Sequence, residues 1–167
     1  DAGTAIGAAA YAVRQSGIKL QAVNNMFLGP GYDNAQCIDA CVMHREKPQW
    51  ELLDNPHEKA AELLAHGQLV AWFRGRMEFG PRALGNRSIL ANPTQQGIAD
   101  AINHQVKFRE HWRPFSPSIL DTAAEKILPR DYRNNTMCMS SPVSAKWQEQ
   151  YPVVICQDGT TRAQVVT

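Results

Sequence analysis

The string GRMEFGPRALGNRSIL, from Gly75 to Leu90, follows a short apolar run, LVAWF (Leu69–Phe73), that predicts a buried strand. The glycines and the proline of the string predict a loop, and glycines allow backbone N–H groups to approach a ligand closely. Loops that leave strand ends are where α/β proteins commonly place their ligands. The string therefore predicts an α/β fold with a ligand-binding loop after this strand.

Basic residues gather in this string and in a second one, VKFREHWRPFSPSIL, from Val106 to Leu120. The whole chain has a net charge of +1, so the enrichment is local. Guanidinium forks bind phosphate or carboxylate oxygens two at a time, so this composition predicts a pocket for a small anion. The stretch contains Arg74, Arg76, Arg82, Arg87, Lys107, Arg109 and Arg113, against the acids Glu78, Asp100 and Glu110.

The second string has its own internal pattern. Lys107 and Arg109 are two residues apart and would point to the same side of an extended segment. Aromatic residues between and after the cations could wall the pocket and lower its dielectric constant, which strengthens contacts to an anion. Two other interpretations stay open, because the first string could be a surface loop of solvated arginines and the second a helix C-terminus whose cations complement the dipole.

Composition excludes several classes of protein. The 167 residues are 44% hydrophobic, enough for one domain with a core, and no run approaches the length of a membrane span. No signal peptide is visible, and the four cysteines form no C-x-x-C pair, so we expect reduced thiols in the cytoplasm. The near-neutral charge argues against general nucleic-acid binding. Cys37 and Cys41 are one helical turn apart without a second pair, and we interpret them as small core residues.

Local signals predict the order of the elements. Capping residues and apolar periodicity predict helices at residues 4–15, 34–44, 55–67, 92–106 and 123–128. Short apolar runs predict strands at residues 69–73, 88–91, 116–120, 152–156 and 161–166, the last two joined as a hairpin through Gln157, Asp158 and Gly159. Asn34 and Asn55 are the expected N-caps of the second and third helices, and LGPGYDN (Leu28–Asn34) is a candidate domain boundary.

At EFGPRALGNRSIL the chain closely resembles a known family, and VKFREHWRPFSPSIL and DGTTRAQ (Asp158–Gln164) extend the resemblance. The family is the O-carbamoyltransferases of nodulation-factor and antibiotic biosynthesis. Their N-terminal part has the fold of the sugar-kinase/actin superfamily, carries an iron site and transfers a carbamoyl group to a hydroxyl. Their C-terminal part is similar to the YrdC fold and uses carbamoyl phosphate and ATP to make carbamoyl adenylate.

The resemblance implies an architecture for this chain. Residues 1–30 would be a remnant of the transferase domain with a linker, and residues 31–167 a truncated YrdC-like domain. The expected fold is a twisted mixed α/β sheet flanked by helices, incomplete at the C-terminus. A serine- and asparagine-containing segment expected further along is not in the sequence, so we expect the chain alone to bind anions with little or no turnover.

The resemblance also implies site residues. Arg82, Lys107, Arg113 and Arg162 match the carbamoyl phosphate pocket, and Lys107-Phe108-Arg109 resembles the K-x-R element of the YrdC fold, which adds Arg109 to the substrate-binding set. Arg82, Lys107 and Arg113 are the expected catalytic residues. Asp1 matches an aspartate of the iron site, whose histidine partners the sequence does not contain. ATP, Mg²⁺ on its phosphates and iron in the transferase domain are the implied cofactors, with a small molecule or sugar as acceptor.

Two alternatives remain at this stage. One is a threonylcarbamoyl-AMP synthase of tRNA modification, against which EFGPRALGNRS and DAGTAIGAA (Asp1–Ala9) speak. The other is a non-catalytic anion-binding or interaction domain. We expect neither membrane nor nucleic-acid partners. Self-association through the first helix is a further hypothesis, because Ile6, Ala9, Ala10 and Val13 would form an apolar stripe.

Overall fold

The computed structural model describes residues 2–23 and 25–167 and confirms the α/β class. Asp1, the expected remnant of an iron site, lies outside the described residues. The chain divides into two compact units. One holds the residues up to Asp54 together with Trp72–Ser88, and the other holds Asn55–Ala71 and Ile89–Thr167. The domain boundary near residue 30 stays a prediction.

Two helices begin the first unit, α1 (Ala2–Gln15) and α2 (Asn34–Met43). The N-cap of α2 is Asp33, so the expectation that Asn34 caps this helix was wrong by one residue. Asp33 has the extended backbone that a cap requires, and its carboxylate accepts a hydrogen bond from the Gln36 N–H at 2.8 Å. The Gln36 side chain accepts one in return from the Asp33 N–H at 3.0 Å, which completes a capping box.

A backbone ladder ties the early chain to the loop after the first strand. The Gly29 N–H donates to the Met77 carbonyl at 2.9 Å, and the Met77 N–H donates to the Pro30 carbonyl at 2.8 Å. Gly31 and Arg76 form an antiparallel bridge next to it. A Cβ at Gly29 would lie 2.9 Å from both Cβ and the carbonyl oxygen of Met77, so this close approach requires glycine.

Strands β1 (Val70–Phe73) and β2 (Arg87–Leu90) pair in a two-stranded sheet, within one residue of their predicted positions. The loop between them carries the first basic string. In the second unit, α3 (Pro56–Ala65) begins after Asn55, whose side chain accepts a hydrogen bond from the Glu58 N–H at 3.2 Å, as the sequence predicts.

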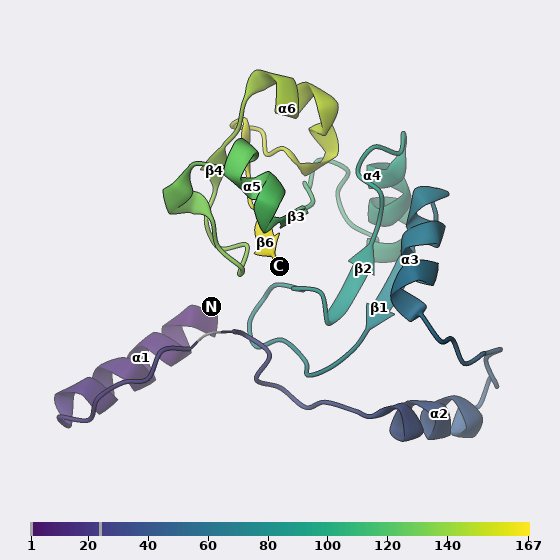
Figure 1. Cartoon of the computed structure of the whole chain (residues 1–167), viewed down its shortest axis with the longest axis horizontal. Helices are drawn as coiled ribbons and strands as arrows, with labels where there is room; N and C mark the ends of the chain where they lie inside the picture. The colour runs from purple at the N-terminus through teal and green to yellow at the C-terminus, as the bar shows by residue number, and fades with distance from the viewer. Residues whose placement is uncertain (1, 24) are drawn as a thin grey trace. The chain divides into compact units, whose positions relative to one another are not determined.

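The core of the second unit lies around a parallel strand pair. Strand β3 (Ser118–Leu120) pairs in parallel with β6 (Gln164–Val166), and α5 (Asp121–Ile127) packs against both (Figure 1). Strands β4 (Ser141–Pro142) and β5 (Thr160–Thr161) form a separate antiparallel pair. The core cluster consists of Ile119, Ala124, Leu128 and Ala163. The described strands therefore form three two-stranded sheets.

The predicted hairpin between residues 152–156 and 161–166 was wrong. Residues Pro152–Val154 form a 3₁₀ turn, η3, and a tight turn follows in which the Cys156 N–H donates to the Thr160 carbonyl at 2.8 Å. The chain then pairs elsewhere, β5 with β4 and β6 with β3. Pro152 has no N–H for a ladder, and the parallel pairing packs Val165 against the core cluster.

The helix predicted at residues 92–106 begins later than expected. The Asn92 side chain accepts hydrogen bonds from the backbone and hydroxyl of Thr94, so it forms a local turn and not an N-cap. A short α4 (Ile98–Asp100) leads directly into a π-helix, η1 (Ala101–Lys107). The short helices η2 (Arg130–Tyr132) and α6 (Ala145–Gln150) had no counterpart in the sequence prediction.

Within the described chain, no helix combines the length and the apolar character that crossing a membrane requires.

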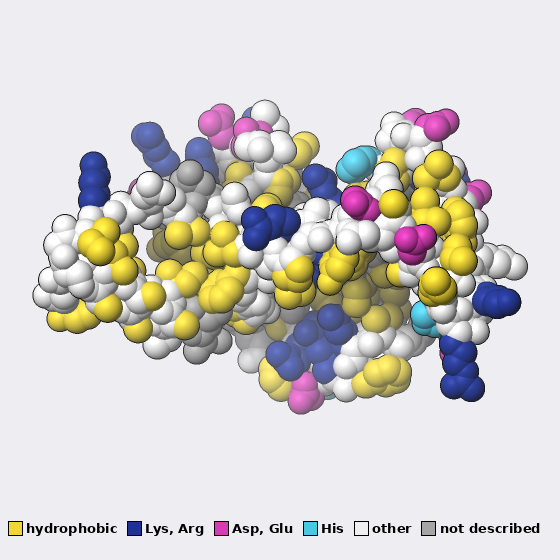
Figure 2. All heavy atoms as spheres, turned by 90° about the horizontal axis from the view of Figure 1, so that it is seen from below, with side chains coloured by type: hydrophobic (Ala, Val, Ile, Leu, Met, Phe, Trp, Pro, Cys, Tyr) yellow, Lys and Arg dark blue, Asp and Glu magenta, His cyan; other side chains and the backbone are white. Residues whose placement is uncertain are grey.

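Helix α1 was expected to expose an apolar stripe. The side chains of Ala9 and Tyr11 are exposed, and those of Ile6, Ala10 and Val13 are half-buried. Figure 2 shows hydrophobic side chains at the surface in the region of this helix, at the left of the view. The apolar side chains of α1 thus provide a surface through which copies of the chain could self-associate, as hypothesised.

We predict that the 167-residue chain self-associates and that a chain beginning at Leu28 does not, because contact between copies would remove the apolar side chains of α1 from water. Light scattering across a concentration series measures the oligomeric state of both. Tyr11→Glu in the full chain is the matched point variant and should weaken association. The same oligomeric state for the long and short chains would contradict the hypothesis.

Candidate anion-binding site

The arginine loop, residues 78–87, is organised around the carboxylate of Glu78. Its Oε1 accepts hydrogen bonds from the backbone N–H groups of Leu84 and Asn86, both at 2.8 Å, and of Arg87 at 3.1 Å. Glu78 is buried, and so are Leu84 and Asn86. Backbone N–H groups that converge on one oxygen in this way form a binding site for an anion. The loop therefore carries its own internal anion.

The ionisation of Glu78 follows from this geometry. Burial alone favours the neutral acid, but the backbone donors of Leu84, Asn86 and Arg87 together outweigh burial and hold the pKa of Glu78 below its ordinary value. Glu78 is thus ionised at neutral pH, and each of the three donors bonds to a charged acceptor.

Two arginines of this string bind the protein itself. The Arg76 guanidinium donates from Nε to the Gly29 carbonyl and from Nη2 to the Leu28 carbonyl, both at 2.8 Å. The Arg87 guanidinium lies 3.6 Å from the centroid of the Phe73 ring and donates to the carbonyls of Gly75 and Asn86 at 3.2 and 3.0 Å. Both side chains brace the loop through the protein's own carbonyl groups, although Arg76 is exposed.

Arg82 differs from its neighbours. Its side chain is half-buried at the middle of the arginine loop, and it makes no hydrogen bond or ion pair with any residue that the structure describes. The bonds from Glu78 to residues 84–87 close the loop immediately after it. The loop around Arg82 is therefore fixed, while its guanidinium has no partner among the described residues.

The second string forms the cationic loop, residues 107–113. Lys107 is the last residue of the π-helix, and Phe108 has a left-handed backbone with φ 49°. The expectation that Lys107 and Arg109 point to one side of an extended segment was therefore wrong, since the chain turns between them. Lys107 is exposed, and across residues 2–23 and 25–167 it has no hydrogen-bond or ion-pair partner.

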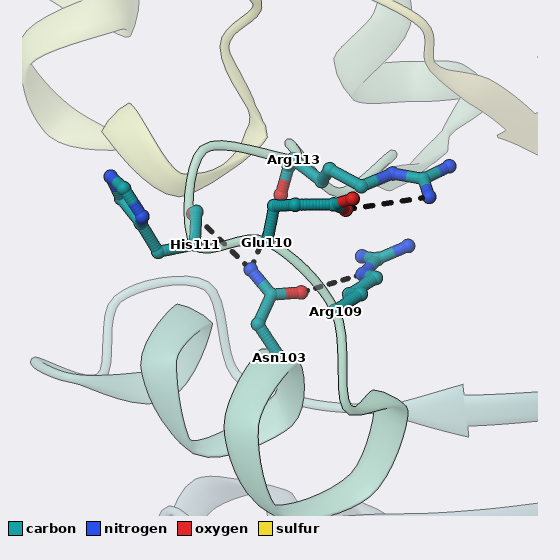
Figure 3. A network of polar contacts seen from close by, with 5 residues as sticks. All are labelled: Asn103, Arg109, Glu110, His111 and Arg113. Carbon is teal, nitrogen blue, oxygen red and sulfur yellow. Dashed lines mark hydrogen bonds and ion pairs between the residues drawn. The ribbon is translucent and has the colours of Figure 1, made fainter.

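Arg109 is anchored by two contacts. Its Nε donates to the Asn103 Oδ1 at 2.6 Å, and its guanidinium lies 4.8 Å from the centroid of the Phe115 ring. Burial lowers the pKa of Arg109, the nearby charge of Arg113 lowers it further, and Glu110 opposes both effects. Figure 3 shows the guanidinium groups of Arg109 and Arg113 extending to the same side of the loop, with His111 pointing away.

The positive charge of this pair is poorly compensated. The contact between Arg113 Nη1 and Glu110 Oε2 measures 3.9 Å, and both side chains are about half exposed, at 51% and 57%. An ion pair of this length at the surface contributes little. Two adjacent guanidiniums with one weak counter-charge repel each other, and a bound phosphate or carboxylate would relieve that repulsion.

The third string, Asp158–Gln164, borders a hollow of 580 Å³ together with the cationic loop. Hydrogen bonds to Thr160 chiefly lower the pKa of Asp158, and the charge of Arg162 adds to this effect. Arg162 is half-buried, and its Nε is buried with no hydrogen-bond partner among the described residues. The hollow is lined by Trp112, Pro114, Cys156, Gln157 and Asp158.

A buried donor without a partner is costly, so the Nε of Arg162 favours a ligand oxygen nearby. The two segments are held together by the Phe115 N–H donating to the Val153 carbonyl at 3.3 Å and the Gln164 N–H donating to the Pro117 carbonyl at 2.8 Å. The resemblance placed both segments at one pocket, and the hollow brings them to a shared surface within the second unit.

The five sequence-predicted binding residues divide between the units. Arg82 belongs to the first unit, whereas Lys107, Arg109, Arg113 and Arg162 belong to the second. That all of them line one cavity stays a prediction. Within the second unit, the structure brings Arg109 and Arg113 together on one side of the cationic loop (Figure 3). Sequence reasoning did not identify Glu78 or Asn103 as functional residues, since a lone acid and a lone amide carry no motif.

No group of three His, Cys, Asp or Glu side chains in the described chain could hold a metal ion. Cys37 and Cys41 are half-buried free thiols on α2, a helix without a buried residue, so neither is the core residue that the sequence interpretation expected.

We predict that Glu78→Gln lowers the free energy of unfolding at pH 7 by about 1–2 kcal/mol, because a neutral amide replaces the charged acceptor of three N–H groups. The folded pKa of Glu78 is below the ordinary value of 4.5, so its stabilisation is present above that pH and is lost as the pH falls through the folded pKa. The difference between parent and variant should therefore shrink below about pH 4.5.

Urea unfolding at pH 7 and at pH 3.5 measures this difference, and hydrogen exchange of the amides of Leu84, Asn86 and Arg87 locates it. Glu149→Gln, at an exposed position of α6, is the control. An unchanged difference at the two pH values would contradict the role assigned to the Glu78 carboxylate.

Comparison with known proteins adds an independent line of evidence. Residues 61–167 match the family profile described as Carbamoyltransferase C-terminus. The chain is 36% identical to the nodulation protein NolNO of Sinorhizobium fredii and 34% identical to nodulation protein U of Rhizobium tropici, in both cases over its whole length. It is 41% identical over 65% of its length to an uncharacterised protein of Methanocaldococcus jannaschii.

The chain spans 25%, 27% and 18% of the lengths of these three relatives, respectively. The family profile covers most of the chain, and it includes both the arginine loop and the cationic loop. The resemblance that was drawn from EFGPRALGNRSIL and VKFREHWRPFSPSIL is thereby confirmed, and the chain belongs to the carbamoyltransferase family, whose C-terminal region it matches.

Proposed function

We propose that this chain binds carbamoyl phosphate and ATP and supports the formation of carbamoyl adenylate in an O-carbamoyltransferase. The observation that carries the proposal is the pair of guanidiniums of Arg109 and Arg113, adjacent and weakly compensated on the cationic loop. Arg82 and Lys107, without partners among the described residues, and the buried Nε of Arg162 add further donors. Family membership supplies the chemistry that these cations would serve.

The proposed reaction brings several negative charges together. Water first hydrolyses carbamoyl phosphate: the water oxygen bonds to phosphorus, the bond from phosphorus to the bridging oxygen breaks, and phosphate and carbamate form. A carbamate oxygen then bonds to the α-phosphorus of ATP, the bond from that phosphorus to the bridging oxygen breaks, and pyrophosphate leaves. Cations held in place offset the repulsion between the reactants and stabilise the charge of the departing phosphates. No side chain of this chain has to act as a nucleophile.

The roles divide according to how each cation is held. Arg113 and Lys107, which are exposed on the cationic loop, would contact phosphate oxygens, and Arg82 would do so from the arginine loop. Arg162 would offer its Nε, which is buried without a hydrogen-bond partner among the described residues, to a ligand oxygen. Arg109 would bind a phosphate oxygen through its remaining guanidinium N–H groups, because its Nε donates to Asn103. Mg²⁺ would be held by the phosphate oxygens of ATP, since no described cluster of side chains could hold it.

In the whole protein, the carbamoyl group would pass to a hydroxyl of a small molecule or sugar in an iron-containing transferase domain. All four cysteines are free thiols, which supports a cytoplasmic location.

We predict that Arg113→Ala and Arg82→Ala each weaken carbamoyl phosphate binding by about 1.5–3 kcal/mol, the range for a hydrogen bond to a charged group. Isothermal titration calorimetry measures the affinity. Arg130→Ala is the control, because Arg130 is exposed and lies outside the three strings. Equal losses in all three variants would indicate a diffuse positive field instead of a pocket.

The choice of ligand separates this proposal from the alternatives. Titrations with carbamoyl phosphate, ATP and L-threonine should show binding of the first two and not the third. Binding of L-threonine in place of carbamoyl phosphate would favour the tRNA-modifying synthase. Binding of carbamoyl phosphate without any binding of ATP would favour a simple anion-binding domain.

A further inference from the structure

Asn103 lies at the centre of the contacts that shape the cationic loop. It is fully buried in the π-helix. Its carbonyl oxygen accepts the backbone N–H groups of Phe108 and Arg109, the latter at 3.0 Å. Its Oδ1 accepts the Arg109 Nε at 2.6 Å, and its Nδ2 donates to the carbonyls of His111 and Arg113 at 3.3 and 3.4 Å (Figure 3). One residue therefore touches four positions of the loop.

The amide group uses its full hydrogen-bonding capacity here. An asparagine side chain offers one oxygen acceptor and two N–H donors, and all three are engaged. The acceptor faces a cation and the donors face two carbonyl oxygens, so the site needs both functions in one planar group. An aspartate would keep the contact to Arg109 but would present an oxygen to the carbonyls of His111 and Arg113.

The π-helix sets up this arrangement. Its bonds span five residues, so the Phe108 N–H reaches the Asn103 carbonyl and the helix ends above the Asn103 side chain. Phe108 then turns into the left-handed region and is 83% exposed. A bulky residue in that region is strained and persists only where surrounding contacts hold it. The contacts to Asn103 are the ones that hold the backbone on both sides of Phe108.

We propose that Asn103 is a positioning residue that fixes the cationic loop so that the guanidiniums of Arg109 and Arg113 face one anion together. Arg109 is held directly through its Nε, and Arg113 is held through its own carbonyl. The effect on ligand affinity passes through these two arginines, since the buried amide does not reach the surface. For its ligand, carbamoyl phosphate, this inference rests on the proposed function.

Hydrogen exchange measured by mass spectrometry, without ligand, tests the positioning role. Asn103→Asp and Asn103→Ser should speed exchange of the amides of residues 108–113 by about tenfold or more, because the contacts that hold them are lost. Exchange around the core cluster at residues 119–124 should stay unchanged. A uniform rise over the second unit, or no rise in the loop, would overturn the inference. Asn103→Ser adds no charge and serves if the aspartate variant does not fold.

The matched control is Asn134→Asp. Asn134 also donates from its Nδ2 to a carbonyl, that of Tyr132 at 3.1 Å, and accepts from Thr136 through its Oδ1 at 3.0 Å. It lies outside the cationic loop, so its substitution should affect exchange near residues 132–136 and leave residues 108–113 as in the parent. Acceleration of residues 108–113 in this control would also overturn the inference.

A double-mutant cycle with Arg113 tests the consequence for binding. Asn103→Ser should weaken carbamoyl phosphate binding about tenfold in the parent and by a smaller factor in the Arg113→Ala background, because one part of its effect acts through Arg113 and the other through Arg109. Equal losses in the two backgrounds would overturn the proposal for Asn103. If Arg113→Ala itself leaves affinity unchanged, the proposed function is wrong, and the exchange data still decide whether Asn103 positions the loop.

Discussion

A loop rich in guanidinium groups has to be held in shape against its own positive charge, and the carboxylate of Glu78 provides this restraint in the arginine loop. Its Oε1 accepts three backbone N–H groups within a buried setting. Because these donors also lower the pKa of Glu78, the carboxylate keeps its charge at neutral pH. The position of Arg82 depends on this closure, since Arg82 lies inside the segment that the three bonds enclose.

The cationic loop solves the same problem without a buried charge. Asn103 is neutral. Where Glu78 offers one oxygen that accepts three N–H groups, the Asn103 side chain accepts one hydrogen bond and donates two. A second carboxylate at that position would pair with Arg109 and compensate the charge that a ligand is meant to meet. A buried amide fixes the backbone while leaving the positive charge of Arg109 and Arg113 uncompensated. The two loops thus show two ways of ordering a cationic segment.

Local chemistry explains which features the sequence could predict. The apolar run at residues 69–73 and the cap at Asn55 depend on neighbours within a few positions, and both are found as expected. The parallel pairing of β3 with β6 depends on distant segments, and the π-helix at Ala101–Lys107 depends on the hydrogen bonds of Asn103, so apolar patterns could not reveal either. The same reason explains the site. Sequence composition identified the cluster of arginines. Because all of its members are the same residue type, composition could not tell which of them bind the protein itself.

Arg76 braces the loop because it donates to the carbonyl oxygens of Leu28 and Gly29, which lie far away along the chain. Arg82 has no such partner among the described residues. That distinction appears only after folding. Counting charges in the string therefore overestimates the number of groups that a ligand can reach, and the family resemblance supplied the finer assignment of Arg82, Lys107, Arg113 and Arg162.

Because these cations differ in exposure, they would contribute in different ways to selecting a ligand over other anions in the cell. The side chain of Arg113 is 51% exposed, so its attraction for an anion is screened by dissolved ions beyond about 8 Å at physiological ionic strength. The buried Nε of Arg162 is shielded from such screening and acts only at hydrogen-bonding range. Capture from solution would thus respond to salt, whereas discrimination after arrival would depend on shape and donor placement, which salt leaves untouched.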